Sequence, residues 1–192
     1  PNLNWEEYAE AMLSIAEEFA VTRIYLLGGV LDKTPHTKEP GVSCVCSSEQ
    51  LKEEMQKYNV QFGNYEGPGR FGTMLLYICQ KKRIEMISIT ARATYYPEFN
   101  IIVQRNPKAI RTVIRRLNSL LRLNLESSDL DREVEEFEAK IGFMVSHNPE
   151  FQTYVEELEK DFIEVKYEEP LDISGDEAVR IAEEFLKRKK ED

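Results

Sequence analysis

The sequence predicts an α/β fold, in which a mostly parallel sheet has helices on both faces and an acidic, all-helical C-terminal extension follows. Helix and strand patterns alternate along residues 1–125. Residues 23–27 and 84–90 are rich in apolar side chains, which is typical of buried strands. From Asp129 onward, apolar residues recur at helical spacing with acidic residues between them. We therefore expect an α/β core at 1–125 and a helical extension at 126–192, which packs on the core or on a neighbouring subunit.

Each element of the core has a local signal. In the helix at residues 5–19, apolar side chains lie three and four positions apart, and Asn4 can cap it. Gly28-Gly29 is expected to end the first strand, because glycine pairs mark turns. Asn106-Pro107 starts the last core helix, since proline is favoured at the first helical position. The expected order is a helix at 5–19, strands at 23–27 and 42–46, helices at 49–58 and 71–82, a strand at 84–90, and the helix from Asn106.

The extension contains three expected helices. The first covers residues 130–145, and Asn148-Pro149 starts the second, which runs to about residue 162. Residues 164–172 are expected to be extended and exposed, and residues 175–190 form the last helix.

The charge of the chain is unevenly distributed. The formal net charge of −10 argues against general affinity for nucleic acid or an anionic membrane. Residues 81–122 carry ten basic and two acidic side chains, whereas residues 123–192 carry nine basic and 22 acidic ones. The basic middle and the acidic end can attract each other within one molecule or between subunits, or each can be a solvated helix face.

The three cysteines do not predict a metal site or a cofactor. Cys44 and Cys46 lie in one expected strand, where we expect them to point to opposite faces, and no second pair completes a zinc site. An odd number of cysteines, Cys79 being the third, suits a reducing compartment. No apolar run is long enough to span a bilayer, and no secretory signal is visible. These observations predict a cytoplasmic protein.

Candidate ligand-binding residues follow the expected strands. Gly28 and Gly29 lie where we expect a strand to end, at the sheet edge where α/β proteins bind ligands, although a tight turn alone also explains them. His36, in the next loop, is a candidate acid or base, or simply a structural histidine. Arg92 and the tyrosine pair Tyr95-Tyr96 follow the strand at 84–90 and line either a pocket or a subunit interface.

A glycine-rich loop completes this set. Glu66-Gly67-Pro68-Gly69 precedes a helix, so Gly67 and Gly69 can present backbone N–H groups to an anion, and Glu66 can act as a base. A structural turn is the other interpretation. The sequence contains no G-x-S-x-G, H-E-x-x-H or C-x-x-C motif, so an enzymatic interpretation depends on position alone.

Several segments, taken in order, resemble the proteasome assembly chaperone 2 family, especially its bacterial members. The resemblance covers roughly residues 1–162. The segments are Pro1-Asn2-Leu3-Asn4-Trp5, Arg23 to Val30, Pro35-His36-Thr37, Tyr65-Glu66-Gly67-Pro68, Asn106-Pro107-Lys108-Ala109, and Tyr154 to Glu159.

The resemblance implies a three-layer αβα domain similar to nucleoside phosphorylases, preceded by a further N-terminal βαβ segment that residues 1–125 lack. It implies self-assembly or assembly with a paralogue, and proteasome subunits or another protein as partners. Some family members end in a hydrophobic-Tyr-X tail that docks on the proteasome, whereas this chain ends Lys189-Lys190-Glu191-Asp192. A carboxylate–amine ligase activity is also attributed to some bacterial members.

Two functions remain open from the sequence. The first is a non-enzymatic, homo-oligomeric, protein-binding assembly factor, which the resemblance and the lack of a catalytic motif favour. The second is a small-molecule-binding protein or enzyme of phosphorylase-like shape, whose site requires that the candidate loops meet at one edge of the sheet. The sequence indicates neither a substrate nor a cofactor.

Overall fold

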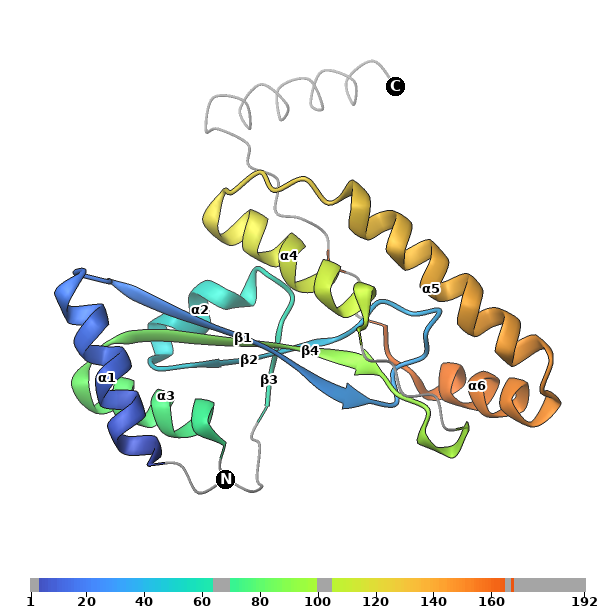
Figure 1. The fold of residues 1–192 in the computed structure, drawn as a ribbon, viewed down its shortest axis with the longest axis horizontal. Helices are drawn as coiled ribbons and strands as arrows, with labels where there is room; N and C mark the ends of the chain where they lie inside the picture. The colour runs from blue at the N-terminus through green and yellow to red at the C-terminus, as the bar shows by residue number, and fades with distance from the viewer. Residues whose placement is uncertain (1–3, 64–69, 100–104, 165–166, 168–192) are drawn as a thin grey trace, which may run out of the picture.

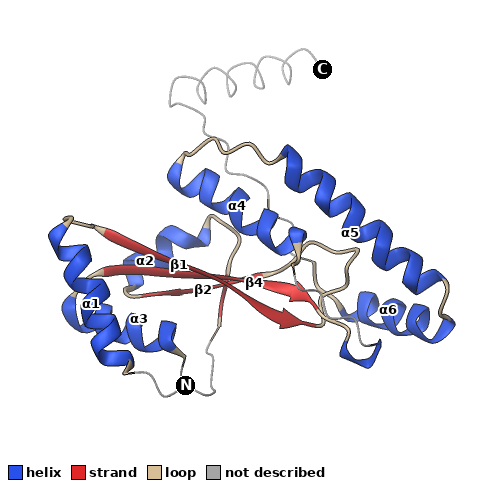
Figure 2. Ribbon diagram, in the orientation of Figure 1, coloured by secondary structure: helices blue, strands red, loops and turns tan. Residues whose placement is uncertain are grey.

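The structure is a computed structural model that describes residues 4–63, 70–99, 105–164 and 167. These residues form an α/β fold in which helices flank a four-stranded sheet (Figure 1, Figure 2). The elements are α1 (Trp5–Glu18), β1 (Arg23–Asp32), β2 (Val42–Cys46), α2 (Glu49–Gln56), β3 (Gln61–Phe62), α3 (Phe71–Lys82), β4 (Glu85–Thr94), a 3-10 turn η1 (Pro97–Phe99), α4 (Pro107–Leu121), α5 (Ser128–Ser146) and α6 (Pro149–Asp161).

The sheet is mixed, with the strand order β1-β4-β2-β3. β1 pairs with β4 and β2 pairs with β3 in parallel, so the prediction of a mostly parallel sheet holds for these pairs. β2, however, runs antiparallel to β4. A parallel return needs a long crossover, usually a helix, and residues 33–41 between β1 and β2 contain no helix.

Two strands are longer than the sequence pattern suggested. β1 continues through Gly28-Gly29 to Asp32, so the expectation that the glycine pair ends this strand was wrong. β4 likewise continues past Thr90 to Thr94. The two strands supply each other with ladder partners from Arg23 opposite Glu85 to Asp32 opposite Thr94, and no described glycine has a positive φ. Tertiary pairing therefore overrides the local turn preference of the glycines.

Helices cover both faces of the sheet. On one face, α1 and α3 pack on residues such as Ile24 and Met86, and on the other, α2 and α4 pack on residues such as Ile87 and Ile89. Gly72 lets α3 approach β1 closely, since a Cβ at this position would lie 2.5 Å from Leu26 Cδ2. The expected likeness to nucleoside phosphorylases remains a prediction.

Most of the expected helix starts are confirmed. Asn106 accepts a hydrogen bond from the Ala109 N–H, and Asn148 accepts from the N–H groups of Glu150 and Phe151. Ser48 caps α2, because its side chain accepts a hydrogen bond from the Leu51 N–H. Asn4 precedes α1, but its side chain makes no capping bond.

The C-terminal helices lie over one end of the core. α5 packs against α4, and α6 packs against α5 (Figure 1). A third apolar cluster joins α5 and α6 to the end of β4 through Tyr96, Ile141, Phe151 and Val155. The expected helix at residues 175–190 lies outside the described residues.

Candidate functional site

The loops after β1 and β4 leave the sheet at the same edge. The two strands are parallel and end opposite each other, at Asp32 and Thr94. As a result, His36 in the loop at residues 33–41 lies next to Tyr96, which follows β4. The sequence predicted this meeting of the histidine segment with the tyrosine pair, although the contact is made by Tyr96 rather than Tyr95.

His36 is buried and already engaged by its neighbours. Only 4% of the residue is exposed. Its backbone N–H donates to the Tyr96 hydroxyl over 2.8 Å, and its Nδ1 lies 3.0 Å from the same oxygen. Burial, followed by the positive charge of Lys108, lowers the pKa of His36 below its ordinary value. A neutral imidazole allows the tyrosine hydroxyl to donate to Nδ1, so the pair forms a closed hydrogen-bonded unit.

Tyr96 links this histidine to the C-terminal helices. Its ring lies edge-on to Phe151 at 5.1 Å and to Tyr154 at 6.1 Å. Burial raises the pKa of Tyr96 to about 12, so the hydroxyl keeps its proton at neutral pH. The His36–Tyr96 pair therefore joins the loop at residues 33–41 to α6.

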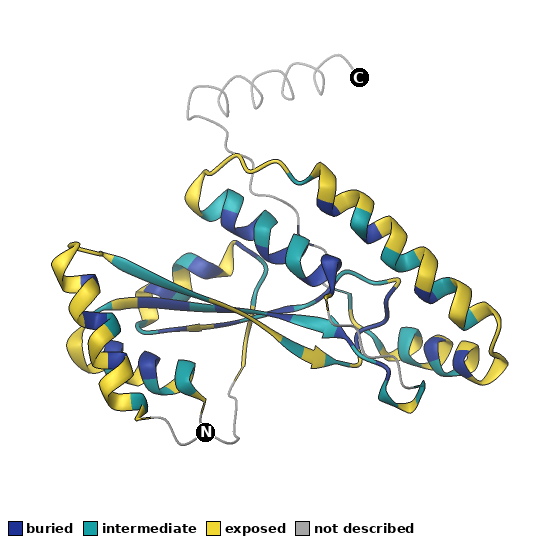
Figure 3. Ribbon diagram, in the orientation of Figure 1, coloured by how far each residue is buried: buried dark blue, intermediate teal, exposed yellow. Residues whose placement is uncertain are grey.

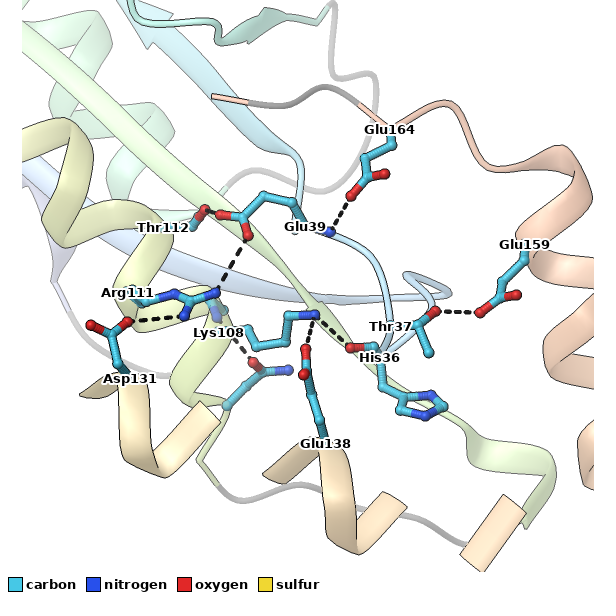
Figure 4. Close-up of polar contacts among 12 residues, drawn as sticks. His36, Thr37, Glu39, Lys108, Arg111, Thr112, Asp131, Glu138, Glu159 and Glu164 are labelled. Carbon is cyan, nitrogen blue, oxygen red and sulfur yellow. Dashed lines mark hydrogen bonds and ion pairs between the residues drawn. The ribbon is translucent and has the colours of Figure 1, made fainter. Parts of the chain in front are cut away.

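A buried lysine extends the same network. The Nζ of Lys108 donates to the His36 carbonyl oxygen over 2.6 Å and forms an ion pair with Glu138 of α5 at 2.5 Å (Figure 4). The Lys108 side chain is only 4% exposed. A buried ammonium group is costly unless it is paired, and here it has two partners.

The loop at residues 33–41 makes further polar contacts with α4 and α6. Glu39 accepts a bond from Thr112 of α4 and lies 3.7 Å from Arg111. Thr37 donates to Glu159 of α6 (Figure 4). We call this set the loop clamp; its members are His36, Thr37, Glu39, Tyr96, Lys108, Arg111, Thr112, Glu138 and Glu159. Its polar groups hold the loop against α4 and α6, and Lys108 joins α4 to α5, which leaves His36 poorly placed to accept a proton from a substrate.

A separate hollow opens on the other face of the same sheet edge. It has a volume of about 650 Å³, and its lining includes Val30, Asp32, Ser43, Gln61 and Arg92. The Arg92 guanidinium lies 3.2 Å from the Asp32 carboxylate through Nη1, and both side chains are more than a third exposed. The Nε of Arg92 is buried and has no hydrogen-bond partner among the described residues. This hollow can hold a small polar molecule, with the ion pair as its polar contact.

The two glycines of β1 lie on opposite faces, because neighbouring strand residues alternate. Gly28 pairs with Thr90 on the face that carries Arg92, whereas Gly29 pairs with Ala91. Both glycines nevertheless line one apolar groove of about 300 Å³, together with Leu27 of β1 and Ala109 of α4. The glycine pair thus contributes to a single surface.

The predicted ligand-binding residues are therefore not gathered in one place. Gly28 and Gly29 line the apolar groove, Arg92 lines the hollow with Asp32, His36 is inside the loop clamp, and Tyr95 is half-buried after β4. Glu66, Gly67 and Gly69 lie outside the described residues. A ligand-binding role for these residues remains a prediction.

Lys108 and Asp32 were not singled out as site residues from the sequence. Lys108 appeared only within the segment Asn106-Pro107-Lys108-Ala109, and a lysine at a helix start gives no local signal of burial. Asp32 could have been suspected, because a carboxylate at a strand end often lines a ligand site.

Cys44 and Cys46 lie on the same face of β2, not on opposite faces as expected. Residues two apart in a strand share a face, and their sulfur atoms are 3.6 Å apart in the core beneath α2 and α4. In the described part of the chain, no three metal-ligating side chains come together, and no helix is long and apolar enough to cross a bilayer.

Much of α1 is exposed (Figure 3). Tyr8 and Ile15 of α1, and Phe19 directly after it, are 59%, 57% and 72% exposed and follow one another at spacings of seven and four. At its beginning, Trp5 and Tyr8 form an apolar hollow of about 550 Å³ with Phe71 of α3. These residues form the α1 row: Trp5, Tyr8, Ile15 and Phe19.

A model of the PAC2 family matches residues 1–145 of the chain. None of the curated proteins matches the chain. Among solved structures, the chain is similar to a PAC2 family protein from Streptomyces avermitilis, with 25% identity and a TM-score of 0.66 over 74% of this chain and 57% of that one. It is also similar to a proteasome-assembly chaperone homologue from Mycobacterium tuberculosis, with 25% identity and a TM-score of 0.68 over 81% of this chain and 63% of that one.

An archaeal structure shows the same fold at lower identity. PbaA from Pyrococcus furiosus, an archaeal homologue of proteasome-assembly chaperone, is 19% identical with a TM-score of 0.57, over 75% of this chain and 60% of that one. The chain thus spans 57% to 63% of the length of these three structures.

Proposed function

The chain belongs to the PAC2 family, and from this premise we propose that it is a non-enzymatic, protein-binding assembly factor. The α1 row is the observation that carries the proposal. Three large apolar side chains that are more than half exposed on one helix are typical of a protein-binding surface, and tyrosine and tryptophan are enriched where binding energy concentrates. The family relatives described as proteasome-assembly chaperone homologues make proteasome subunits the first partners to test.

The arrangement of the polar groups supports the same proposal. A general acid or base must reach its substrate, and His36 is buried within the loop clamp. The loop clamp instead holds one end of the protein together. The α1 row is not part of the clamp and stays exposed to bind another protein.

The test compares two variants of α1. I15S/F19S removes two members of the row, whereas E10Q/S14A changes exposed polar positions of the same helix. We expect the wild-type protein and E10Q/S14A to form a homo-oligomer or a complex with purified proteasome α subunits in native mass spectrometry, and I15S/F19S to form neither while keeping its melting temperature. A monomeric wild-type protein without affinity for those subunits would contradict the proposal.

The hollow at Asp32 and Arg92 favours a second candidate, a small-molecule-binding function. A half-exposed arginine with a buried, unpartnered Nε suits an anionic or carbonyl-bearing ligand. Calorimetry with nucleosides, inorganic phosphate and small carboxylates would test it. Binding that is lost in Arg92→Met but kept in Lys33→Met, a matched change at another exposed cation, would establish this function.

A further inference from the structure

Two cysteines of β2 form a close pair in the core. Cys44 and Cys46 are two residues apart on one strand, and their Sγ atoms are separated by 3.6 Å. Both are reduced, and both residues are almost completely buried, at 2% and 3% exposed. The third cysteine, Cys79, lies on α3 in the cluster on the opposite face of the sheet. Only one pair of thiols is therefore close enough to react within the molecule.

The surroundings make the two sulfur atoms unequal. Cys46 is the last residue of β2, and Ser48 caps α2 two residues later, so the positive end of that helix is close in the chain. The hydrogen bond between the two thiols, followed by the nearby charge of Lys52, lowers the pKa of Cys46 despite its burial. The same hydrogen bond raises the pKa of Cys44. This is the asymmetry of a pair in which one thiolate attacks and the other thiol resolves.

We propose that Cys44 and Cys46 form a dithiol redox site, which hydrogen peroxide oxidises to a disulfide within β2. Peroxide is the appropriate oxidant because it is small, and because it reacts with a thiolate to give a sulfenic acid that condenses with a neighbouring thiol.

The reaction has two balanced steps. In the first, the Cys46 thiolate attacks one oxygen of peroxide, an S–O bond forms as the O–O bond breaks, and the departing hydroxide takes up a proton to become water. In the second, the Cys44 sulfur attacks the Cys46 sulfur, the S–S bond forms as the S–O bond breaks, and hydroxide leaves with the Cys44 proton as water. Two thiols and one peroxide thus give one disulfide and two water molecules.

Access to the pair depends on α2. This eight-residue helix packs on β2 and covers the core there with Leu51 and Met55. A short helix held by two buried side chains can open locally without global unfolding. Disulfide formation shortens the Sγ–Sγ distance from 3.6 Å to about 2 Å and draws both side chains away from their packing positions. Oxidation is therefore coupled to the packing of α2 on β2.

The experiment oxidises the native protein with a small excess of hydrogen peroxide, alkylates the remaining thiols and maps them by mass spectrometry. We expect a Cys44–Cys46 disulfide in the wild-type protein and in the matched control C79A. We expect C44A to accumulate a Cys46 sulfenic acid that dimedone labels, and C46A to remain unoxidised. Oxidation of Cys46 should be on the order of tenfold faster than that of Cys79.

A measurement without mutation covers the case in which a core variant does not fold. Phenylarsine oxide bridges two thiols that lie within reach of one arsenic atom, so the native protein should bind one equivalent and lose two alkylatable cysteines. Three alkylatable thiols after either reagent, or a disulfide that appears only in denaturant, would overturn the proposal.

Discussion

The two ends of this molecule differ in how far they cover their apolar side chains. At the C-terminal end, buried residues of α4, α5 and α6 pack on the sheet and on one another, and ion pairs join α4 to α5, although Phe143 of α5 is 64% exposed. At the other end, Tyr8, Ile15 and Phe19 of the α1 row are each more than half exposed. The difference separates a region built for internal stability from one that has apolar surface available for a partner.

The charge distribution explains why the C-terminal end is closed. The basic α4 and the acidic α5 are joined by ion pairs within one chain: Arg111 with Asp131 at 3.0 Å, Lys108 with Glu138 at 2.5 Å, and Arg105 with Glu133 at 3.1 Å. The sequence left open whether the basic and acidic segments attract each other within one molecule, between subunits, or not at all. In these residues, the attraction acts within one molecule. Only Lys108 is buried, so the exposed pairs orient α5 more than they stabilise it.

The largest effect is expected from Phe151, the aromatic centre of the closed end. Its ring stacks on Phe99 at 4.2 Å, and the residue is 1% exposed. Phe151→Ala should lower the free energy of unfolding by about 3–5 kcal/mol, because it leaves a cavity in the core. Phe19→Ala, at an exposed position of α1, should change it by less than about 0.5 kcal/mol. Urea denaturation measures both, and equal losses would mean that the two ends do not differ.

A smaller effect is expected from the buried cation of the loop clamp. Lys108→Met leaves the His36 carbonyl oxygen without its donor and Glu138 without its cation, which should cost about 2–3 kcal/mol. Arg105→Met breaks a mostly exposed pair with Glu133 and should cost less than about 1 kcal/mol. A Lys108→Met protein as stable as the wild type would show that the clamp does not hold the loop.

Removing one hydroxyl from the clamp should cost about 1 kcal/mol. Tyr96→Phe keeps the ring contacts with Phe151 but deprives the His36 N–H and Nδ1 of their shared partner. Hydrogen exchange at the His36 amide should accelerate, and thermal denaturation gives the stability change. An unchanged exchange rate would indicate that the hydroxyl bond contributes nothing in solution.

The stability of the closed end should depend on pH through His36. Its pKa is lowered in the folded protein, first by burial and then by Lys108, while Glu159 and Glu138 oppose the shift. The unfolded chain therefore binds more protons below about pH 6.5, so stability falls as the pH drops below this value toward the folded pKa. His36→Gln should flatten this part of the denaturation profile, and an identical profile in the variant would assign the dependence to other groups.

The smallest effect on stability is expected at α1. Ile15→Ser removes an exposed apolar side chain and should change the free energy of unfolding by less than about 0.5 kcal/mol. Its effect should appear in association alone, as a lower apparent mass in analytical ultracentrifugation. A large loss of stability would place Ile15 in the core and remove it from the proposed binding surface.

Local patterns in the sequence were sufficient for most elements. Helical spacing identified α1, α3, α4, α5 and α6, and the Asn-Pro pairs located the starts of α4 and α6, because capping depends only on nearby atoms. The strand β3 was missed, since two residues are too short to show a period. The lengths of β1 and β4 were underestimated, because each strand is prolonged by the other.

By itself, the sequence determined the α/β class, the order of the helices and the family resemblance, all of which depend on neighbours in the chain. Only the tertiary structure decided that β2 runs antiparallel to β4, that His36 and Lys108 are buried together, and that β1 continues through Gly28 and Gly29. These features depend on contacts between residues about 40 to 70 positions apart, and no local periodicity records such contacts.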